Sequence, residues 1–273
     1  MTVQPGSVQP ESQPAPVRAE AEGQVLVVTI DRPPANAVDT GTSKALFAAF
    51  DRLRRDPSLR VGILTGAGER FFSAGWDLKA AAQGESIEAD HGPGGFAGLT
   101  EFLDIGKPVI AAVNGLAFGG GFELVLAADL VVAADHADFA LTEATLGLVA
   151  DAGGLLRLPD RVPRAIALEY LLTGRRFGAA EAARWGLVNK VVPAAEVMAA
   201  ARTLAGAICA AAPLAVAAVL EILRETEGMS VRNGYRVLTG NPLPAYRAML
   251  DSQDAREGAQ AFAERRRPVW RGR

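Results

Sequence analysis

The stretch PVIAAVNGLAFGGGFELVLAADLVVAAD, residues 108–135, decides the predicted fold. Its two ends, PVIAAVNG (108–115) and LVVAAD (130–135), are short apolar runs bounded by Gly, Asn or Asp, as is typical of buried strands. Between them, FGGGFELVLAAD (118–129) reads as a loop that enters a helix. Because parallel strands need a crossover connection, which is usually helical, strand, helix and strand in this order predict an α/β unit.

The same alternation continues outward from this stretch. VLVVTI (25–30) and VGILTG (61–66) are predicted strands, and TSKALFAAFDRLRRD (42–56) between them has helical spacing. LVNKVVP (187–193) is a last short strand, after which alanine-rich helical segments dominate. The prediction is therefore an α/β fold, with a core over 24–195 and a helical C-terminal region over 196–273.

Composition narrows the classes of partner. The 28 basic and 31 acidic residues leave a net charge of −3, which argues against nucleic acid. The single cysteine and two histidines, Cys209, His91 and His136, have no zinc-site spacing, so no metal is expected. No apolar run approaches the ~18 residues of a membrane span. Residues 1–23 are rich in Pro, Gln, Ser and Glu, lack a secretory pattern, and are expected to be a disordered tail on a cytoplasmic protein.

Two glycine-bearing turns lie in FFSAGWD (71–77) and AFGGGFE (117–123). Neither has the glycine spacing of a dinucleotide-binding motif or the Gly-Lys-Ser/Thr ending of a P-loop. A glycine turn that opens a helix leaves its first N–H groups unpaired and accessible to a ligand. Two such turns that converge would bind an oxyanion, although each is equally an ordinary tight turn when taken alone.

Three carboxylates follow in largely apolar surroundings. Glu123 stands at the start of the predicted helix, where the helix dipole alone could explain it. Glu143 lies 20 residues later, and Asp151 precedes the pair Gly153–Gly154. Isolated carboxylates in apolar segments are costly unless they are paired or used. A pair in which one member is protonated and one ionised suits general acid/base chemistry.

Three motifs resemble the crotonase superfamily, the enoyl-CoA hydratases and isomerases: FFSAGWDLKA (71–80), KPVIAAVNGLAFGGGFELVLAAD (107–129) and LTEATLGLVADAGGLLRLP (141–159). The likeness runs from Val25 to the C-terminus and implies a ββα spiral core. Within the superfamily, HGPGGFAGLTE (91–101), LTGRRFGAAEAARWGLVNKVV (172–192) and AFAERRRPVWRGR (261–273) are similar to the carnitinyl-CoA dehydratase (crotonobetainyl-CoA hydratase) subfamily.

The resemblance implies roles for the turns and for two of the carboxylates. The backbone N–H groups of Trp76 and Gly120 would form the oxyanion hole for the thioester oxygen, and Glu123 and Glu143 would be the catalytic pair. In dehydration Glu143 would take the α-proton while Glu123 protonates the leaving β-hydroxyl, and hydration would reverse both roles. We expect Glu123, near a helix N-terminus, to ionise more readily than Glu143.

Substrate contacts are also implied. A quaternary ammonium could bind aromatic faces, for which Trp76, Phe96 and Phe118 are candidates, with Asp151 as an anionic partner. Each of these aromatic residues is equally explained by core packing. For the CoA moiety the resemblance points to four residues that could otherwise belong to an ordinary surface: Ala74, Lys79, Phe262 and Arg265.

Three functions stay open at this stage. The presence of both glutamates favours a CoA-thioester hydro-lyase, either of the carnitinyl type or a general enoyl-CoA hydratase. Asp151, which stands where many hydratases have glycine and dienoyl-CoA isomerases have aspartate, favours an isomerase. A non-catalytic acyl-CoA binding protein is the third. No cofactor is expected, since CoA is part of the substrate, and the resemblance implies a homotrimer or hexamer with the C-terminal helices at subunit contacts.

Overall fold

The strands form two sheets in the computed structural model, which describes residues 15–86, 88–240 and 243–273. The larger sheet has the strand order β1 (Val17–Glu22), β2 (Val25–Ile30), β3 (Val61–Gly66), β5 (Val109–Val113), β7 (Leu130–Ala134) and β10 (Lys190–Val192). The smaller sheet has the order β4 (Phe71–Ser73), β6 (Leu116–Phe118), β8 (Asp138–Ala140) and β9 (Phe177–Gly178).

Parallel pairing joins β2, β3, β5, β7 and β10. Every residue of β3 and β5 is buried, as expected for strands covered on both faces. The predicted α/β fold and its strands at 25–30, 61–66, 108–115, 130–135 and 187–193 are therefore confirmed, with small shifts at the ends.

The amino-terminal prediction is partly wrong. Residues 1–14 lie outside the described residues, but Val17–Glu22, expected to be disordered, is strand β1. It pairs antiparallel with β2 along its whole length, from Val17 opposite Ile30 to Glu22 opposite Val25. Alternation of Val17, Ala19 and Ala21 with charged residues is the pattern of a half-buried edge strand, and the polar composition of the preceding residues obscured it.

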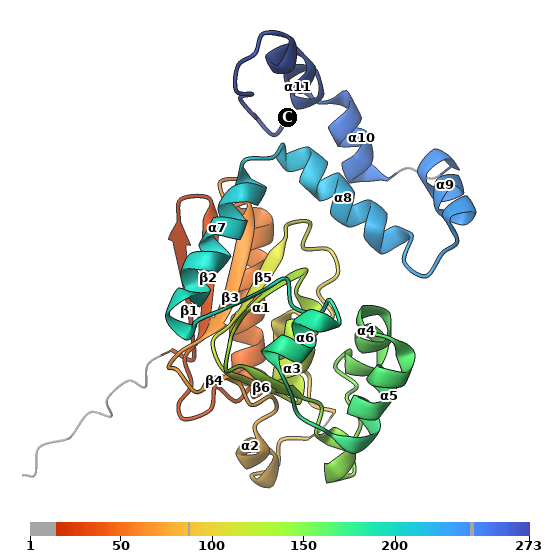
Figure 1. The fold of residues 1–273 in the computed structure, drawn as a ribbon. Coiled ribbons are helices and arrows are strands. Elements are labelled where there is room, and N and C mark those ends of the chain that lie inside the picture. Colours follow the sequence, from red (N-terminus) through yellow and green to blue (C-terminus); the bar gives the residue numbers. More distant parts are fainter. Residues whose placement is uncertain (1–14, 87, 241–242) are drawn as a thin grey trace, which may run out of the picture.

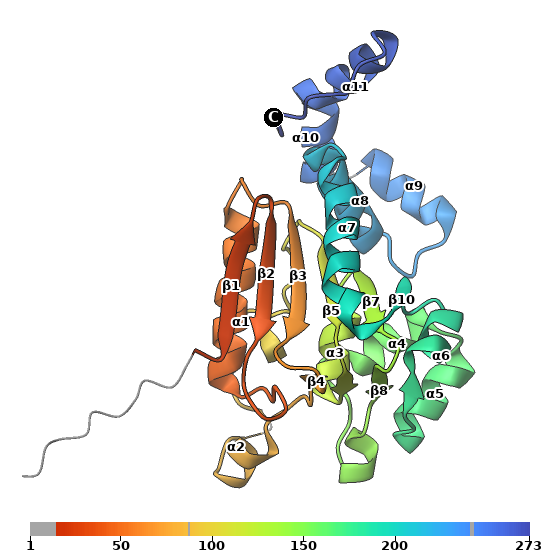
Figure 2. The same ribbon diagram turned by 60° about the vertical axis from the view of Figure 1, so that its left-hand side comes forward.

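Helices cover both faces of the larger sheet (Figures 1 and 2). Helix α1 packs on β1, β2 and β3, and α7 packs on β3, β5 and β7. Asp39 caps α1 by accepting the Thr42 N–H. The core also contains three short 3₁₀ helices, and the bounds of all of these helices are α1 (Thr40–Arg55), α2 (Leu78–Ala82), η1 (Phe96–Gly98), α3 (Gly120–Ala127), η2 (Glu143–Leu146), α4 (Gly154–Arg161), α5 (Arg164–Thr173), α6 (Ala179–Arg184), η3 (Ala194–Glu196) and α7 (Val197–Cys209).

The C-terminal arm is helical, as predicted, and extends away from the core (Figures 1 and 2). It consists of α8 (Pro213–Glu225), α9 (Val231–Gly240), α10 (Pro244–Asp251) and α11 (Gln253–Ala263). The side chain of Trp270 donates from Nε1 to the Ala210 carbonyl oxygen at 2.8 Å, which ties the last residues of the chain to the α7–α8 junction. Among the described residues no single helix is long and apolar enough to cross a membrane; Ala194–Cys209 and Pro213–Glu225 pass only as a pair bent by 102°.

The smaller sheet brings the predicted site together. Strands β4 and β6 pair in parallel, with Ser73 opposite Ala117, so the turns that follow them leave the same edge. Strand β6 leads into α3, and β8, which pairs with β6, leads into η2. Both glycine turns, Glu123 and Glu143 are thus placed at one end of this sheet.

Candidate active site

The two glycine turns are packed backbone against backbone. Gly75 has φ +82°, a conformation that side chains disfavour. A Cβ placed on Gly75 would lie 2.6 Å from the backbone N of Gly120 and 2.7 Å from the Phe118 carbonyl oxygen. Only glycine fits at this contact. An ordinary tight turn would not need glycine for this reason, which is the close approach of two segments that are distant in the sequence.

Three amides in these turns have no acceptor among the described residues: those of Trp76, Gly120 and Gly121. The neighbouring N–H groups are paired: Gly75 donates to Ser73 Oγ, Asp77 to the Val38 carbonyl and Gly119 to the Ala140 carbonyl. Within the part of the chain that the structure describes, no hydrogen bond is found for the N–H of Trp76 or of Gly120. Gly120 is the first residue of α3, where an N–H lacks an intrahelical partner. The arrangement offers two donors from adjacent turns to one acceptor.

Glu123 lies in the first turn of α3 and is only 3% exposed. Its Oε1 accepts the backbone N–H of Gly154, the first residue of α4, at 2.8 Å. Burial raises the pKa of Glu123 to about 8; the bond from Gly154 opposes this shift, and the nearby charges of Glu143 and Asp151 add to it. Glu123 is therefore a positioned carboxyl that readily holds a proton near neutral pH.

Glu143 begins η2 and reaches the other side of the glycine turn. Its Oε1 would lie 2.9 Å from a Cβ on Gly119, whose φ of +53° itself disfavours a side chain. Its Oε2 is fully buried and has no hydrogen-bond partner among the described residues. Burial raises the pKa of Glu143, and Asp151 contributes in the same direction. An orphaned buried carboxyl oxygen is costly and is common where a substrate supplies the missing partner.

The expectation that Glu123 ionises readily is wrong, whereas its order relative to Glu143 stays a prediction. The expectation rested on the helix dipole, a surface effect of about 0.3–1 kcal/mol. Removing the Glu123 carboxylate from water outweighs the dipole, and its pKa rises to about 8. The position of Glu123 at the start of α3 still matters, because it directs the side chain toward the N-terminus of α4.

The sequence of this chain is similar to those of known proteins over almost its whole length. Residues 20–273 match the family described as enoyl-CoA hydratase/isomerase. The chain belongs to the enoyl-CoA hydratase/isomerase family. It is 60% identical over 251 residues to the carnitinyl-CoA dehydratase of Salmonella typhi, covering 92% of this chain and 96% of the relative.

Solved structures agree with the family and with the predicted crotonase-type core. The enoyl-CoA hydratase from Mycobacterium tuberculosis H37Rv superimposes with a TM-score of 0.86 at 45% identity, covering 95% of this chain and all of the other. The carnitinyl-CoA hydratase from Mycobacterium avium gives a TM-score of 0.75 at 43% identity, covering 96% and 100%.

The predicted substrate-binding side chains surround the two turns unequally. The ring of Phe96 lies against Gly120, where its Cε1 would be 2.5 Å from an added Cβ. Phe118 is covered on one face by the guanidinium of Arg176, 4.6 Å from the ring centroid. Asp151 is exposed but close enough to raise the pKa of both glutamates. The indole of Trp76 is half-buried and donates from Nε1 to Glu85 at 3.2 Å.

The predicted CoA contacts are not assembled within one chain of this family member. Ala74 and Lys79 lie beside the first glycine turn and on α2, whereas Phe262 and Arg265 lie on and just after α11. Figure 1 shows α2 and α11 at opposite ends of the molecule. Within one chain the arm extends away from the core and keeps the two pairs apart, so the role of these four residues in binding CoA stays a prediction.

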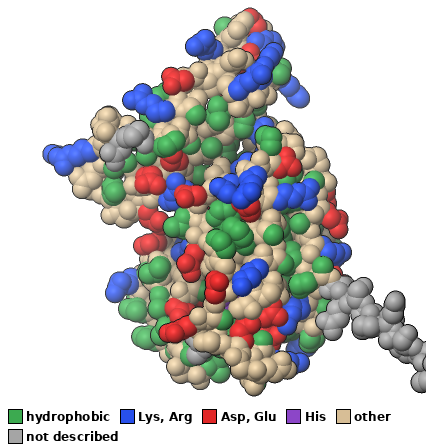
Figure 3. Space-filling model, turned by 180° about the vertical axis from the view of Figure 1, so that it is seen from behind, with side chains coloured by type: hydrophobic (Ala, Val, Ile, Leu, Met, Phe, Trp, Pro, Cys, Tyr) green, Lys and Arg blue, Asp and Glu red, His purple; other side chains and the backbone are tan. Residues whose placement is uncertain are grey.

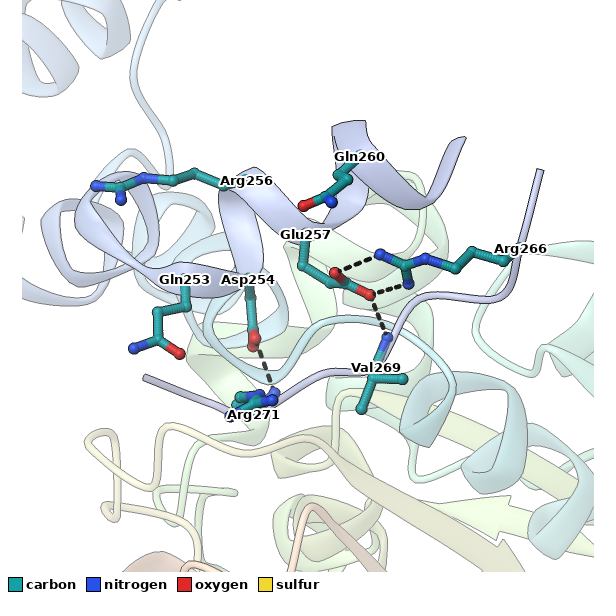
Figure 4. Close-up of a pocket in the computed structure, with 8 residues that line it drawn as sticks. All are labelled: Gln253, Asp254, Arg256, Glu257, Gln260, Arg266, Val269 and Arg271. Atoms are coloured by element: carbon teal, nitrogen blue, oxygen red, sulfur yellow. Dashed lines mark hydrogen bonds and ion pairs between the residues drawn. The ribbon is translucent and has the colours of Figure 1, made fainter. Parts of the chain in front are cut away.

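Two cavities lie outside this site. One, about 550 Å³, lies between α11 and the last residues of the chain, where Glu257 pairs with Arg266 and Asp254 accepts the N–H of Arg271 (Figure 4). The other, about 970 Å³, separates α8 from the core and is lined mostly by apolar side chains. Over the described ranges no three His, Cys, Asp or Glu side chains are grouped to hold a metal ion.

Sequence reasoning missed three residues around the site. Gly154 supplies the donor for Glu123, and its place before α4 was visible only as a glycine pair. Glu85 and His91 lie in a stretch of mixed composition, where neither periodicity nor a motif signalled a role. Their contacts depend on how the segment between α2 and η1 folds back onto α1, which no local pattern reveals.

Proposed function

We propose that this hydro-lyase of the enoyl-CoA hydratase/isomerase family adds water reversibly across the α,β double bond of crotonobetainyl-CoA, giving carnitinyl-CoA. The observation that carries the proposal is the convergence, at one end of the smaller sheet, of the unpaired amides of Trp76 and Gly120, the buried Glu123 and the half-buried Glu143. The 60% identity to a carnitinyl-CoA dehydratase supports the choice of acyl group.

The oxyanion hole is assigned to the N–H groups of Trp76 and Gly120. Removing a proton next to a thioester carbonyl places negative charge on its oxygen. Two fixed amides stabilise that charge, and losing one such donor typically costs about 2.7–4 kcal/mol of barrier. The backbone packing of Gly75 on Gly120 holds the two donors in place before substrate arrives.

Glu143 and Glu123 are assigned the two proton transfers. In dehydration the ionised Glu143 takes the α-proton, the Cβ–O bond breaks, and protonated Glu123 gives its proton to the departing hydroxyl, which leaves as water. Hydration reverses each step. The raised pKa of about 8 supports Glu123 as the proton donor in dehydration, and mutual repulsion of two nearby carboxylates favours a pair that shares one proton.

Kinetics with three substrates test this function. Purified protein is assayed with crotonobetainyl-CoA, crotonyl-CoA and a dienoyl-CoA, following loss of the enoyl or dienoyl absorbance. We expect crotonobetainyl-CoA to give the highest kcat/KM. Higher turnover of crotonyl-CoA would instead indicate a general hydratase, loss of dienoyl absorbance an isomerase that uses Asp151, and binding without turnover an acyl-CoA binding protein.

Assembly into a homotrimer or hexamer in the cytoplasm, without added cofactor, completes the proposal. The arm exposes large apolar side chains that include Val231, Tyr235 and Phe262, the last 88% exposed. Figure 3 shows hydrophobic side chains on the arm and in a cluster on the body below it. A second copy that covers them could bring Phe262 and Arg265 to the CoA of its neighbour, where Ala74 and Lys79 lie.

A further inference from the structure

A half-buried carboxylate, Glu85, lies next to the predicted oxyanion hole and has no cationic partner among the described residues. Its Oε1 accepts the indole N–H of Trp76 at 3.2 Å. Its Oε2 accepts the N–H and the hydroxyl of Thr40 at 3.2 and 3.0 Å. All three donors are neutral, so they fix the carboxylate without compensating its charge. Glu85 thereby holds the indole of the residue whose backbone N–H faces the thioester oxygen.

A second aromatic pair lies at the other oxyanion turn. His91 packs edge-on against Phe96, with ring centroids 5.3 Å apart, and Phe96 lies against Gly120. His91 is held by Ser43, whose Oγ lies 2.7 Å from Nδ1 and also accepts the N–H of Ala97. We call Trp76 with Glu85 at one oxyanion turn, and His91 with Phe96 at the other, the aromatic arc.

The electrostatic balance at the aromatic arc is negative. The charged groups that act on His91 are Glu85, Asp90, Lys44 and Asp39, three acids against one lysine. Asp39 is paired with Arg32 at 2.8 Å, which leaves Glu85 as the fixed, unpaired carboxylate nearest the indole. Burial lowers the pKa of His91, so its ring adds no positive charge near neutral pH.

Aromatic faces around an uncompensated carboxylate are the chemistry that binds a quaternary ammonium. We propose that the aromatic arc is the acyl-group subsite, and that Glu85 and the Trp76 indole select a substrate with a trimethylammonium group next to the reacting carbons. The proposal rests on the proposed function and gives the ammonium a different place from Phe118 and Asp151. Phe118 already faces the cation of Arg176, and Asp151 is exposed.

Selectivity between a charged and a neutral substrate of equal shape tests this assignment. The probes are crotonobetainyl-CoA and 5,5-dimethylhex-2-enoyl-CoA, which replaces the ammonium nitrogen by carbon. The quantity measured is the ratio of their kcat/KM values. Glu85→Gln keeps the acceptor for Trp76 but removes the charge, and should lower the ratio by roughly 3- to 30-fold.

Two further variants keep the test decisive. Trp76→Leu should also lower the ratio, and because any disturbance of the Trp76 amide slows both substrates alike, the ratio isolates the indole. Glu88→Gln removes the same charge from an exposed position in the same loop, and should leave both rates unchanged. Melting temperatures show whether each variant is folded, and the Trp76 variant remains informative if Glu85→Gln is not.

The outcomes separate this inference from the proposed function. A wild-type preference for crotonobetainyl-CoA that survives in both arc variants would overturn the arc and leave the hydro-lyase standing. A fall in the ratio for Asp151→Asn but not for Glu85→Gln would move the ammonium to Asp151. A wild-type enzyme that treats both probes alike would overturn the choice of substrate, and the arc with it.

Discussion

The first turn of α3 and the 3₁₀ turn η2 each present one glutamate to the same place, but they support it differently. Glu123 belongs to a helix buried almost throughout and has a donor from Gly154 at 2.8 Å. Glu143 belongs to a turn with no buried residue, and its Oε2 is buried without a described partner. One carboxyl is fixed by the fold, whereas the other has an oxygen to which no described residue donates a hydrogen bond.

If both glutamates transfer protons during the reaction, replacing either of them by glutamine should have the largest effect on the rate. Glu123→Gln and Glu143→Gln should each lower kcat by roughly 10²- to 10⁴-fold, the usual contribution of a positioned acid or base. Steady-state hydration of crotonobetainyl-CoA measures this, with the exposed Glu196→Gln as control. A variant that retains the full rate would assign the chemistry to a single glutamate.

Adding a methyl group at Gly120, in the second glycine turn, should lower kcat by less than either glutamate substitution. In Gly120→Ala the new Cβ would approach the Phe96 ring to 2.5 Å, so either the ring or the amide must move. Loss of one oxyanion donor predicts a decrease in kcat of roughly 10²- to 10³-fold. Gly206→Ala, on α7 with open space around the added Cβ, is the matched control and should be silent. Unchanged turnover of Gly120→Ala would remove this amide from the hole.

Stability should respond to pH through the buried member of the pair. As pH rises from 4.5 toward 8, the unfolded chain releases a proton that folded Glu123 retains, so the free energy of unfolding falls. The fall reaches at most about 1.4 kcal/mol per pH unit. Urea unfolding across this window should show the slope reduced in Glu123→Gln. Identical slopes in both proteins would mean that Glu123 is ionised in the folded state throughout.

The smallest effect is expected from removing the charge of Asp151, which acts on both glutamates. Asp151 raises the pKa of Glu123 and of Glu143, so Asp151→Asn should move the pH–rate profile toward lower pH by less than about one unit. Asp160→Asn, an exposed change on α4, should leave the profile in place. A loss of rate without any shift would instead point to direct contact between Asp151 and substrate.

The core could be predicted from sequence because its strands are short apolar runs separated by glycine and helical spacing, as in 108–135. Edge strand β1 could not be predicted, because its apolar residues are small and alternate with charged ones. It is held in place by pairing with β2, which no local pattern reveals. The two glutamates were recognisable by their segments. The raised pKa of Glu123 was not, because its burial depends on how α4 closes over α3, a contact between residues far apart in the chain.

The last residues of the chain have a practical consequence for handling the protein. Asp254 accepts the N–H groups of Arg271 and Gly272, the N–H of Gln253 donates to the carbonyl oxygen of Arg273, and Trp270 reaches back to Ala210. These hydrogen bonds hold the last residues of the chain against α11 and the end of α7. Affinity tags and fusion partners should therefore be attached at the amino terminus, since a carboxyl-terminal fusion would disturb these hydrogen bonds.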